Sequence, residues 1–310
     1  MKTQEYSQAS VDHPERCEDA ILLLTPEGKA PVFAVIDGMG GQQHQLADGT
    51  MITGHDASQW VRNVLVEDLA MLPPEIDASP KGEAETKVIA AVMRAHQSVR
   101  RELNNEDQYA AGNRVGAVIT VVVVCENGAR LLTVQVGDTR GYLYSEGELI
   151  QLCPDEDNIE YFIRQGLLSP DDGDRISTIL NSYNGIDEPE TEGTVTIAGS
   201  PYDLYIAWRW FMVGNTVLNI PAANIVINAL GVHAENPLPL TSRIEVAPAD
   251  TIFLCSDGLY KNLSEAEMLD GLGKGDQAAQ VLGEAALERS KTPANRRSTQ
   301  DDISVVIAQW

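Results

Sequence analysis

The sequence predicts an α+β fold in which two antiparallel sheets are covered by pairs of helices. Short apolar runs occur as neighbours with turn residues between them, which is typical of antiparallel hairpins. Stretches with helical spacing of apolar residues occur in pairs, once early and once late in the chain. A strict alternation of strand and helix would indicate a parallel sheet instead, and the sequence does not show one.

The first part of the chain contains a hairpin followed by two helices. Residues 20–24 and 31–36 are apolar runs, and the segment between them carries proline and glycine. Apolar residues recur at helical spacing over 57–72, where two prolines end the pattern, and again over 83–103. The second helix has an apolar stripe that we expect to face the core: Val88, Ala91, Val92, Ala95 and Val99.

Strands dominate the middle of the chain. Residues 117–125 are continuous and β-branched, so we expect them to be buried on both faces. Asn127-Gly128 is a hairpin signal, and 130–136 should pair back onto the preceding strand. Residues 141–144 and 148–152 are expected to continue this sheet as a meander.

The last part of the chain repeats the mixture of strands and paired helices. A buried strand is predicted at 251–255, helices at 264–272 and 277–290, and a final strand at 303–308. We expect residues 1–310 to form a single domain, because no interdomain linker is visible.

The segment from about 171 to 225 follows a predicted helix at 159–168 and is the hardest to assign. It mixes polar loops, glycine and proline with an aromatic patch at 202–211. Long insertions in compact domains are usually functional or disordered, and this one is too aromatic for simple disorder. We expect a flap that selects substrates. The alternative is that 202–211 is a strand whose alternate residues fill a small core of the flap itself.

Composition limits the classes of partner. The formal net charge is −24, so nucleic acid and anionic membranes would be repelled. An acidic protein that handles phosphate needs local positive charge, which bound metal supplies compactly. The four cysteines form no CxxC pair and the first residues are polar, which favours a cytoplasmic location. No apolar run is long enough to span a membrane.

Several acidic residues share one context, because each is expected where a core strand meets a loop. They are Glu18, Asp19, Asp37, Asp257, Asp301 and Asp302. One such acid is usually solvated, but several that converge would repel one another unless a hard divalent cation bound them. Glycine follows Asp37 and Asp257 directly and permits the close backbone approach that a carbonyl ligand needs.

These residues lie in motifs that resemble the PPM family of metal-dependent protein phosphatases, the type 2C class, in its bacterial form. The motifs occur in the family's order over nearly the whole chain: Glu18-Asp19, the run 35–41 with sequence VIDGMGG, the run 136–140 with sequence VGDTR, the run 254–259 with sequence LCSDGL, and the run 301–304 with sequence DDIS. The resemblance implies a four-layer sandwich of two sheets flanked by helix pairs, with a binuclear metal site between the sheets.

The resemblance also implies a set of ligands. Asp37 would bridge both cations, the Gly38 carbonyl and Glu18 would bind one of them, and Asp19 would support that cation from behind. Asp37 and Asp19 are therefore the residues expected to be essential for catalysis.

The second cation would be held by Asp257 and Asp301, and Asp138 would help to hold a weaker third one. The two main cations would be manganese or magnesium, and the attacking group a hydroxide that bridges them. The implied substrates are phosphoserine and phosphothreonine in proteins, in a pathway that includes a serine/threonine kinase. For Asp138 alone, a role as an ordinary turn residue is the alternative.

Three positions depart from the family pattern. Pro14 stands where many members have a phosphate-binding arginine, Asp302 where asparagine is usual, and Glu156 near the place of a histidine that acts as general acid. These departures leave open a catalytically weak regulatory member. A hydrolase of small phosphoesters on the same metal core is a third possibility.

Arg16 is a candidate replacement for the missing arginine. In an extended segment, positions 14, 16 and 18 point to one face, so Arg16 would lie beside Glu18. A guanidinium suits bidentate contact with phosphate. The alternative is that Arg16 forms an ion pair with Glu15 or Glu18 at the surface.

Overall fold

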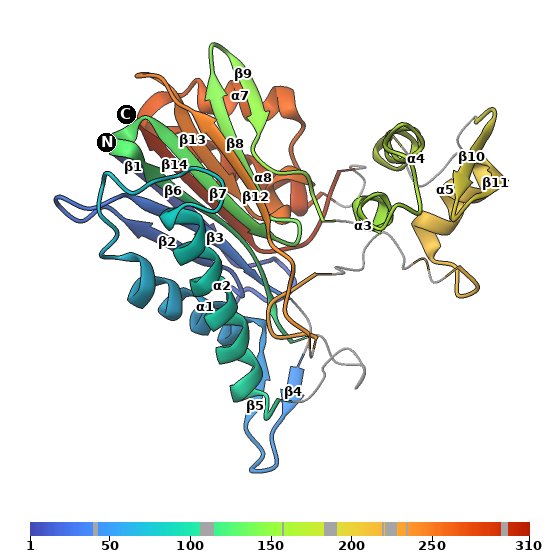
Figure 1. Ribbon diagram of the computed structural model, residues 1–310, viewed down its shortest axis with the longest axis horizontal. Coiled ribbons are helices and arrows are strands. Elements are labelled where there is room, and N and C mark those ends of the chain that lie inside the picture. Colours follow the sequence, from blue (N-terminus) through green and yellow to red (C-terminus); the bar gives the residue numbers. More distant parts are fainter. Residues whose placement is uncertain are drawn as a thin grey trace. The chain divides into compact units, whose positions relative to one another are not determined.

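The computed structural model describes residues 1–39, 43–105, 115–156, 158–182, 191–218, 220, 228–233, 235–292 and 297–310. The chain forms two compact units (Figure 1). The first comprises Met1–Cys153 together with Ala229–Trp310, and the second is Pro154–Asn228. Each unit is described by itself. None of the described helices is both long enough and apolar enough to cross a lipid bilayer.

Within the described residues, the first unit contains two five-stranded antiparallel sheets. One sheet has the order β12-β7-β6-β3-β2. Its strands are β2 (Ala20–Leu24), β3 (Val32–Gly38), β6 (Ala117–Cys125), β7 (Arg130–Val136) and β12 (Leu240–Glu245). The other has the order β1-β14-β13-β8-β9. Its strands are β1 (Lys2–Gln8), β8 (Arg140–Ser145), β9 (Glu148–Gln151), β13 (Thr251–Cys255) and β14 (Ile303–Gln309).

Each sheet is covered by a pair of helices, so the predicted α+β fold with antiparallel sheets is confirmed. Helices α1 (Gly54–Leu69) and α2 (Glu83–Glu102) pack on the first sheet. Helices α7 (Glu265–Leu272) and α8 (Ala278–Ser290) pack on the second. The expected apolar stripe of α2 is buried in full.

Successive side chains of a strand point to opposite faces of its sheet, so one strand contributes to two different hydrophobic clusters. In β3, Val32 and Ala34 face the helices α1 and α2, whereas Phe33 lies in a second cluster. That second cluster also contains Leu254 of β13 and Val306 of β14, so the inner faces of the two sheets pack on each other. This packing brings the ends of β2, β3, β13 and β14 to one region of the first unit.

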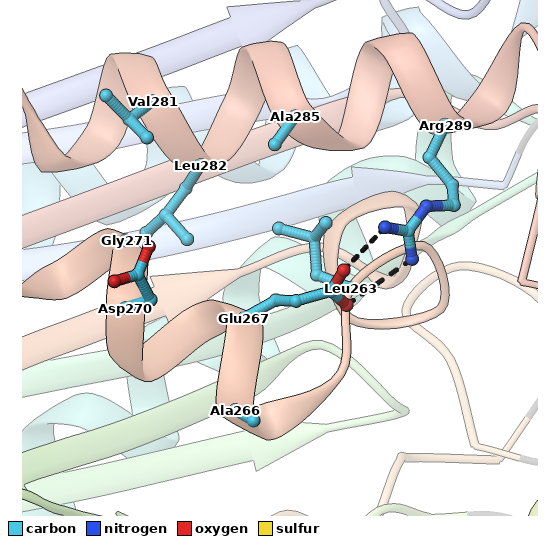
Figure 2. Close-up of a pocket in the computed structure, with 9 residues that line it drawn as sticks. All are labelled: Leu263, Ala266, Glu267, Asp270, Gly271, Val281, Leu282, Ala285 and Arg289. Carbon is cyan, nitrogen blue, oxygen red and sulfur yellow. Dashed lines mark hydrogen bonds and ion pairs between the residues drawn. The ribbon is translucent and has the colours of Figure 1, made fainter.

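Helices α7 and α8 enclose a hollow of about 290 Å³ on the outer side of their sheet (Figure 2). Helix α7 begins with a capping box in which Ser264 and Glu267 exchange hydrogen bonds, as is common at helix N-termini. Arg289 of α8 forms an ion pair with Glu267 at a distance of 2.5 Å, at the rim of the hollow. None of the predicted metal ligands lines it.

The predicted meander is wrong beyond β7. Strand β8 does not continue the sheet of β6 and β7 but pairs with β13 in the other sheet. The reason is that the free edge of β7 is already occupied by β12, a strand that the sequence pattern did not reveal. The chain therefore leaves the first sheet at Gly137, whose φ of +92° suits glycine, and crosses to the second.

Among its described residues, the second unit is built from helices and a small hairpin. Its elements are α3 (Asn158–Arg164), α4 (Pro170–Ser182), β10 (Thr194–Ile197), β11 (Ser200–Asp203) and α5 (Leu204–Val213). Phe162 of α3 and Phe211 of α5 meet edge to face in its core, with ring centroids 5.3 Å apart.

The alternative of a strand over 202–211 is wrong, because β11 ends at Asp203 and α5 is a helix, but its expectation that the patch fills a small core is met by Phe211 and Tyr202. Asp203 caps α5 by accepting the backbone N–H groups of Tyr205 and Ile206 at 3.0 and 3.3 Å. Residues 183–190, 219 and 221–225 of the predicted flap lie outside the described residues.

Candidate metal centre

Four aspartates lie close to a fifth, Asp37, and affect its pKa. Asp37 is at the end of β3, Asp19 precedes β2, Asp138 lies between β7 and β8, and Asp257 starts the short helix α6 (Asp257–Tyr260) after β13. Asp301 precedes β14. Strand ends from both sheets therefore deliver the carboxylates to one place.

The carboxylates raise one another's pKa. The pKa of Asp37 lies well above its ordinary value because the group is buried and because Asp19, Asp257, Asp301 and Asp138 place negative charge around it. Burial and the charge of Asp257 raise the pKa of Asp301 to about 7, against the opposing effects of Lys261 and the backbone N–H of Asp302. Such crowding of negative charge is what a bound cation would relieve.

Asp19 differs from the other aspartates in the hydrogen bonding of its carboxylate. Both of its carboxylate oxygens are buried without a hydrogen-bond partner, and so is Oδ1 of Asp257. Burial and the charge of Asp302 raise the pKa of Asp19, while the nearby hydroxyls of Ser304 and Ser256 oppose the rise without reaching hydrogen-bond geometry. A buried acceptor left unpaired costs about 1–3 kcal/mol, so these oxygens fit a site for cations.

Glycines let the backbone close around the site, as the sequence predicted. A Cβ on Gly38 would overlap the carbonyl oxygens of Gly54 and Glu18. A Cβ on Gly258 would overlap the carbonyl oxygen of Asp302. Gly40 and Gly41 of the same motif lie outside the described residues.

Glu18 is held by two neighbours. Its side chain is buried and accepts from Arg16 Nη2 at 3.1 Å. The ion pair between Arg16 and Glu18 named as an alternative is therefore present, with Arg16 itself exposed. The backbone N–H of Glu18 donates to Oδ2 of Asp302. A contact of Arg16 with phosphate stays a prediction.

Lys261 is a member of the site that sequence analysis missed. Its ammonium contacts Oδ2 of Asp257, one helical turn earlier on the chain. Burial lowers the pKa of Lys261, but the charges of Asp257, Asp138 and Asp301 outweigh this and raise it above its ordinary value. The spacing of four residues at the start of a helix was the available signal.

The described carboxylates do not form a closed cage. Among the residues that the structure describes, no three side chains of His, Cys, Asp or Glu are arranged as a ready ligand group. The fit of the site to divalent cations therefore rests on its chemistry: hard oxygen donors, unpaired buried oxygens and mutual repulsion. Lys261 is the cation that meets Asp257 in this arrangement.

Glu156 belongs to the second unit. It is buried, and its carboxylate contacts the guanidinium of Arg164 and accepts from Asn228 Nδ2 at 2.7 Å. Both of these partners belong to the second unit as well.

Comparisons with known proteins identify the class. The sequence profile described as "Protein phosphatase 2C" matches residues 9–290. The serine/threonine protein phosphatase PstP of Mycobacterium tuberculosis is 25% identical over 87% of this chain, which spans 40% of that relative's length. The serine/threonine phosphatase stp of Listeria innocua is 24% identical over 94% of this chain and 89% of its own.

Solved structures agree at the level of the fold. Stp1 from Staphylococcus aureus superposes with a TM-score of 0.65 at 16% identity, covering 100% of this chain and 95% of its own. The catalytic domain of PstP, solved with two manganese ions, gives a TM-score of 0.59 at 22% identity, covering 99% and 97%.

The matches therefore define a class of bacterial serine/threonine phosphatases. This chain belongs to the protein phosphatase 2C family. The resemblance inferred from the motifs is confirmed, and the expected phosphatase activity agrees with the names of the relatives.

Proposed function

We propose that the chain is a metal-dependent phosphatase that hydrolyses phosphoserine and phosphothreonine in proteins. The observation that carries the proposal is the convergence on Asp37 of four further aspartates, with the oxygens of Asp19 buried and unpaired. The fold would be the four-layer sandwich of the family, with a binuclear site between the two sheets.

The ligands fall into two groups at neighbouring strand ends. Asp37, the Gly38 carbonyl and Glu18 would bind one cation. Asp19 would not bind this cation directly but would support the residues that do. Manganese or magnesium would supply an activated water and neutralise the charge of the bound phosphate. Asp37 would belong to both groups and would orient the activated water and the phosphate. Asp37, together with Asp19 that supports the first group, is therefore proposed to be catalytic.

The second group is Asp257 and Asp301, with Asp37 shared between the two. Asp138 lies close enough to affect the pKa of Asp37, which supports a weaker third site there. Lys261 contributes positive charge on the same side as Asp257. When a divalent cation binds at Asp257, it would repel the ammonium of Lys261. The ammonium would then move away from Asp257 toward phosphate or solvent.

Substrate binding and selection would use other residues. Arg16 lies beside Glu18 and is exposed, which suits it to meet the phosphate. The segment 171–225, which falls within the second unit, is the proposed flap that chooses among phosphoproteins. We further propose that residues 1–310 act as one cytoplasmic phosphatase domain, opposing a serine/threonine kinase.

Hydrolysis of an aryl phosphate, with and without manganese, tests the proposal. Activity should require added divalent cation and disappear with a chelator. Turnover of phosphoserine peptides should exceed that of small phosphorylated metabolites. Activity that survives chelation would exclude the two-metal mechanism, and a preference for small phosphoesters would replace the assigned substrate class.

A catalytically weak regulatory role is the second candidate. It is favoured by Pro14 and by Glu156, whose carboxylate is already in contact with Arg164 and Asn228. Manganese binding without turnover of any phosphopeptide would support this role over the first.

A further inference from the structure

A short hairpin follows the metal-binding turn. After β3 ends at Gly38, β4 (Gln43–Gln45) and β5 (Met51–Thr53) form a two-stranded antiparallel ribbon, and α1 then begins at Gly54 (Figure 1). Their described pairing is only with each other. The hairpin thus occupies the connection between the proposed metal-binding turn and the first helix.

The two ends of this connection are locked together. A Cβ on Gly54 would lie 2.7 Å from the carbonyl oxygen of Met39 and 2.8 Å from the carbonyl of Gly38. Gly54 and Gly38 therefore touch through their backbones, which only residues without a Cβ allow. Both ends of the hairpin therefore lie beside Gly38. The base of the hairpin adjoins the proposed metal site, wherever its tip lies.

The ribbon has a buried face and an exposed face. In the register of the pair, His44 faces Ile52 and both are buried, with Ile52 in the core under α1. Gln45 faces Met51, and both are exposed, as is Gln43 two residues earlier. Met51 leaves 45% of its surface accessible. The inner face anchors the ribbon, and the outer face presents two amides and a thioether.

The exposed face is nearly free of charge. In a chain with a net charge of −24, residues 43–53 carry one acid, Asp48. Its carboxylate accepts the backbone N–H of Thr50 at 2.9 Å, at the tip of the hairpin. A phosphopeptide is itself acidic, so it can approach this face with less repulsion than it meets over most of the chain.

We propose that the hairpin 43–53 binds the polypeptide that flanks the phosphorylated residue of the substrate. Gln43 and Gln45 supply donors and acceptors for the peptide backbone, and Met51 supplies an adaptable apolar contact. At about 3.3 Å per residue, the five residues from base to tip span roughly 16 Å, so the ribbon reaches about five residues of an extended peptide. This inference rests on the proposed phosphatase function.

The test uses the double variant Gln45→Ala/Met51→Ala, whose positions are outside the catalytic and metal-binding set. The substrates are an 11-residue phosphoserine peptide and an aryl phosphate. We expect kcat/KM for the peptide to fall about fivefold to tenfold, through KM, because truncating good contact residues costs about 1 kcal/mol or more. Aryl-phosphate hydrolysis should stay within about twofold.

Met71→Ala is the matched control, because Met71 is a 68% exposed methionine in the same unit, beyond the end of α1. It should leave both substrates unchanged. Equal losses on both substrates in the hairpin variant would show damage to the metal site and overturn the proposal. An unchanged peptide KM would overturn it as well.

Binding separates this inference from the proposed function. A fluorescent peptide that carries a non-hydrolysable phosphonate in place of phosphoserine is titrated with each variant in the presence of manganese. We expect about fivefold weaker binding for the hairpin variant alone. If the wild type lacks all turnover, the proposed function fails while the binding ratio still decides the role of the hairpin. Equal Kd values, or binding by neither protein, would contradict it.

Discussion

The carboxylate of Asp302 accepts a hydrogen bond from the backbone of Glu18, and this bond connects the start of the last strand, β14, to the segment that precedes β2. Oδ2 of Asp302 accepts the backbone N–H of Glu18, and Oδ1 accepts the backbone N–H of Ser10 at 2.6 Å. The resemblance to the family predicts asparagine at this position, but an asparagine side chain has only one acceptor oxygen. Each oxygen of the aspartate accepts one backbone N–H here, and an asparagine in the same place would put its NH2 group opposite one of these two donors.

Asp302→Asn should destabilise the protein, because one buried N–H would lose its partner. We expect the free energy of unfolding in urea to fall by about 1–3 kcal/mol. Asp276→Asn is the control, since Asp276 forms an exposed ion pair with Lys2 and should change little. A stability equal to that of the wild type would show that the two hydrogen bonds are not needed.

Asp37→Asn should act in opposite directions on activity and on stability without metal. Hydrolysis should fall by several orders of magnitude, because a shared ligand is lost. The metal-free protein should melt at a higher temperature, because one of the mutually repelling buried carboxylates has become neutral. Differential scanning calorimetry in chelator measures this, and the stabilisation by manganese should disappear. A lower melting temperature in chelator would contradict the account of repulsion.

Lys261→Met should lower the stability of the metal-free protein and raise the affinity of the site for manganese. The ammonium of Lys261 neutralises Asp257, so its removal leaves that carboxylate without its cation. A cation would then bind without competition from the ammonium. Calorimetric titration with manganese should give a lower Kd, by about tenfold for about 1.4 kcal/mol of competition. Lys274→Met, at an exposed ion pair with Asp270, should leave the Kd unchanged.

Arg16→Ala should separate phosphate binding from metal binding. If Arg16 contacts the phosphate, KM for a phosphopeptide should rise about tenfold, while the manganese Kd stays within about twofold. A changed manganese Kd with an unchanged KM would instead assign Arg16 to the support of Glu18, with which it forms an ion pair.

His96 should make the protein sensitive to mild acid. It is buried in α2, where its Nδ1 accepts the backbone N–H of Gly231 at 3.1 Å. Burial and the nearby Arg100 lower the pKa of His96 to about 4, against about 6.5 in the unfolded chain. The folded state thus favours the neutral ring, and the contribution present above about pH 6.5 is lost as the pH falls toward 4.

The measurement is the free energy of unfolding at pH 7 and at pH 4.5 for the wild type and for His96→Gln. The wild type should lose up to about 3 kcal/mol more than the variant over this range. Equal losses would show that His96 does not titrate in this way.

Local patterns were sufficient for much of the fold. The hairpin of β2 and β3, the buried strand β6 and the apolar stripe of α2 followed from periods of two and 3.6, because each buries its own apolar face. Strand β1 was not predicted, since its residues are largely polar and only pairing with β14 makes it a strand. For the aromatic patch a strand was one of two alternatives, but the Asp203 cap begins a helix there.

The sequence by itself determined which residues are candidates for metal binding, because the acids and glycines of the motifs can be identified at fixed places along the chain. Tertiary structure alone decided which of them meet. The crossing of β8 to the second sheet and the two hydrogen bonds of Asp302 depend on segments that sheet pairing and packing bring together. Such contacts depend on long-range geometry, which residue spacing does not record.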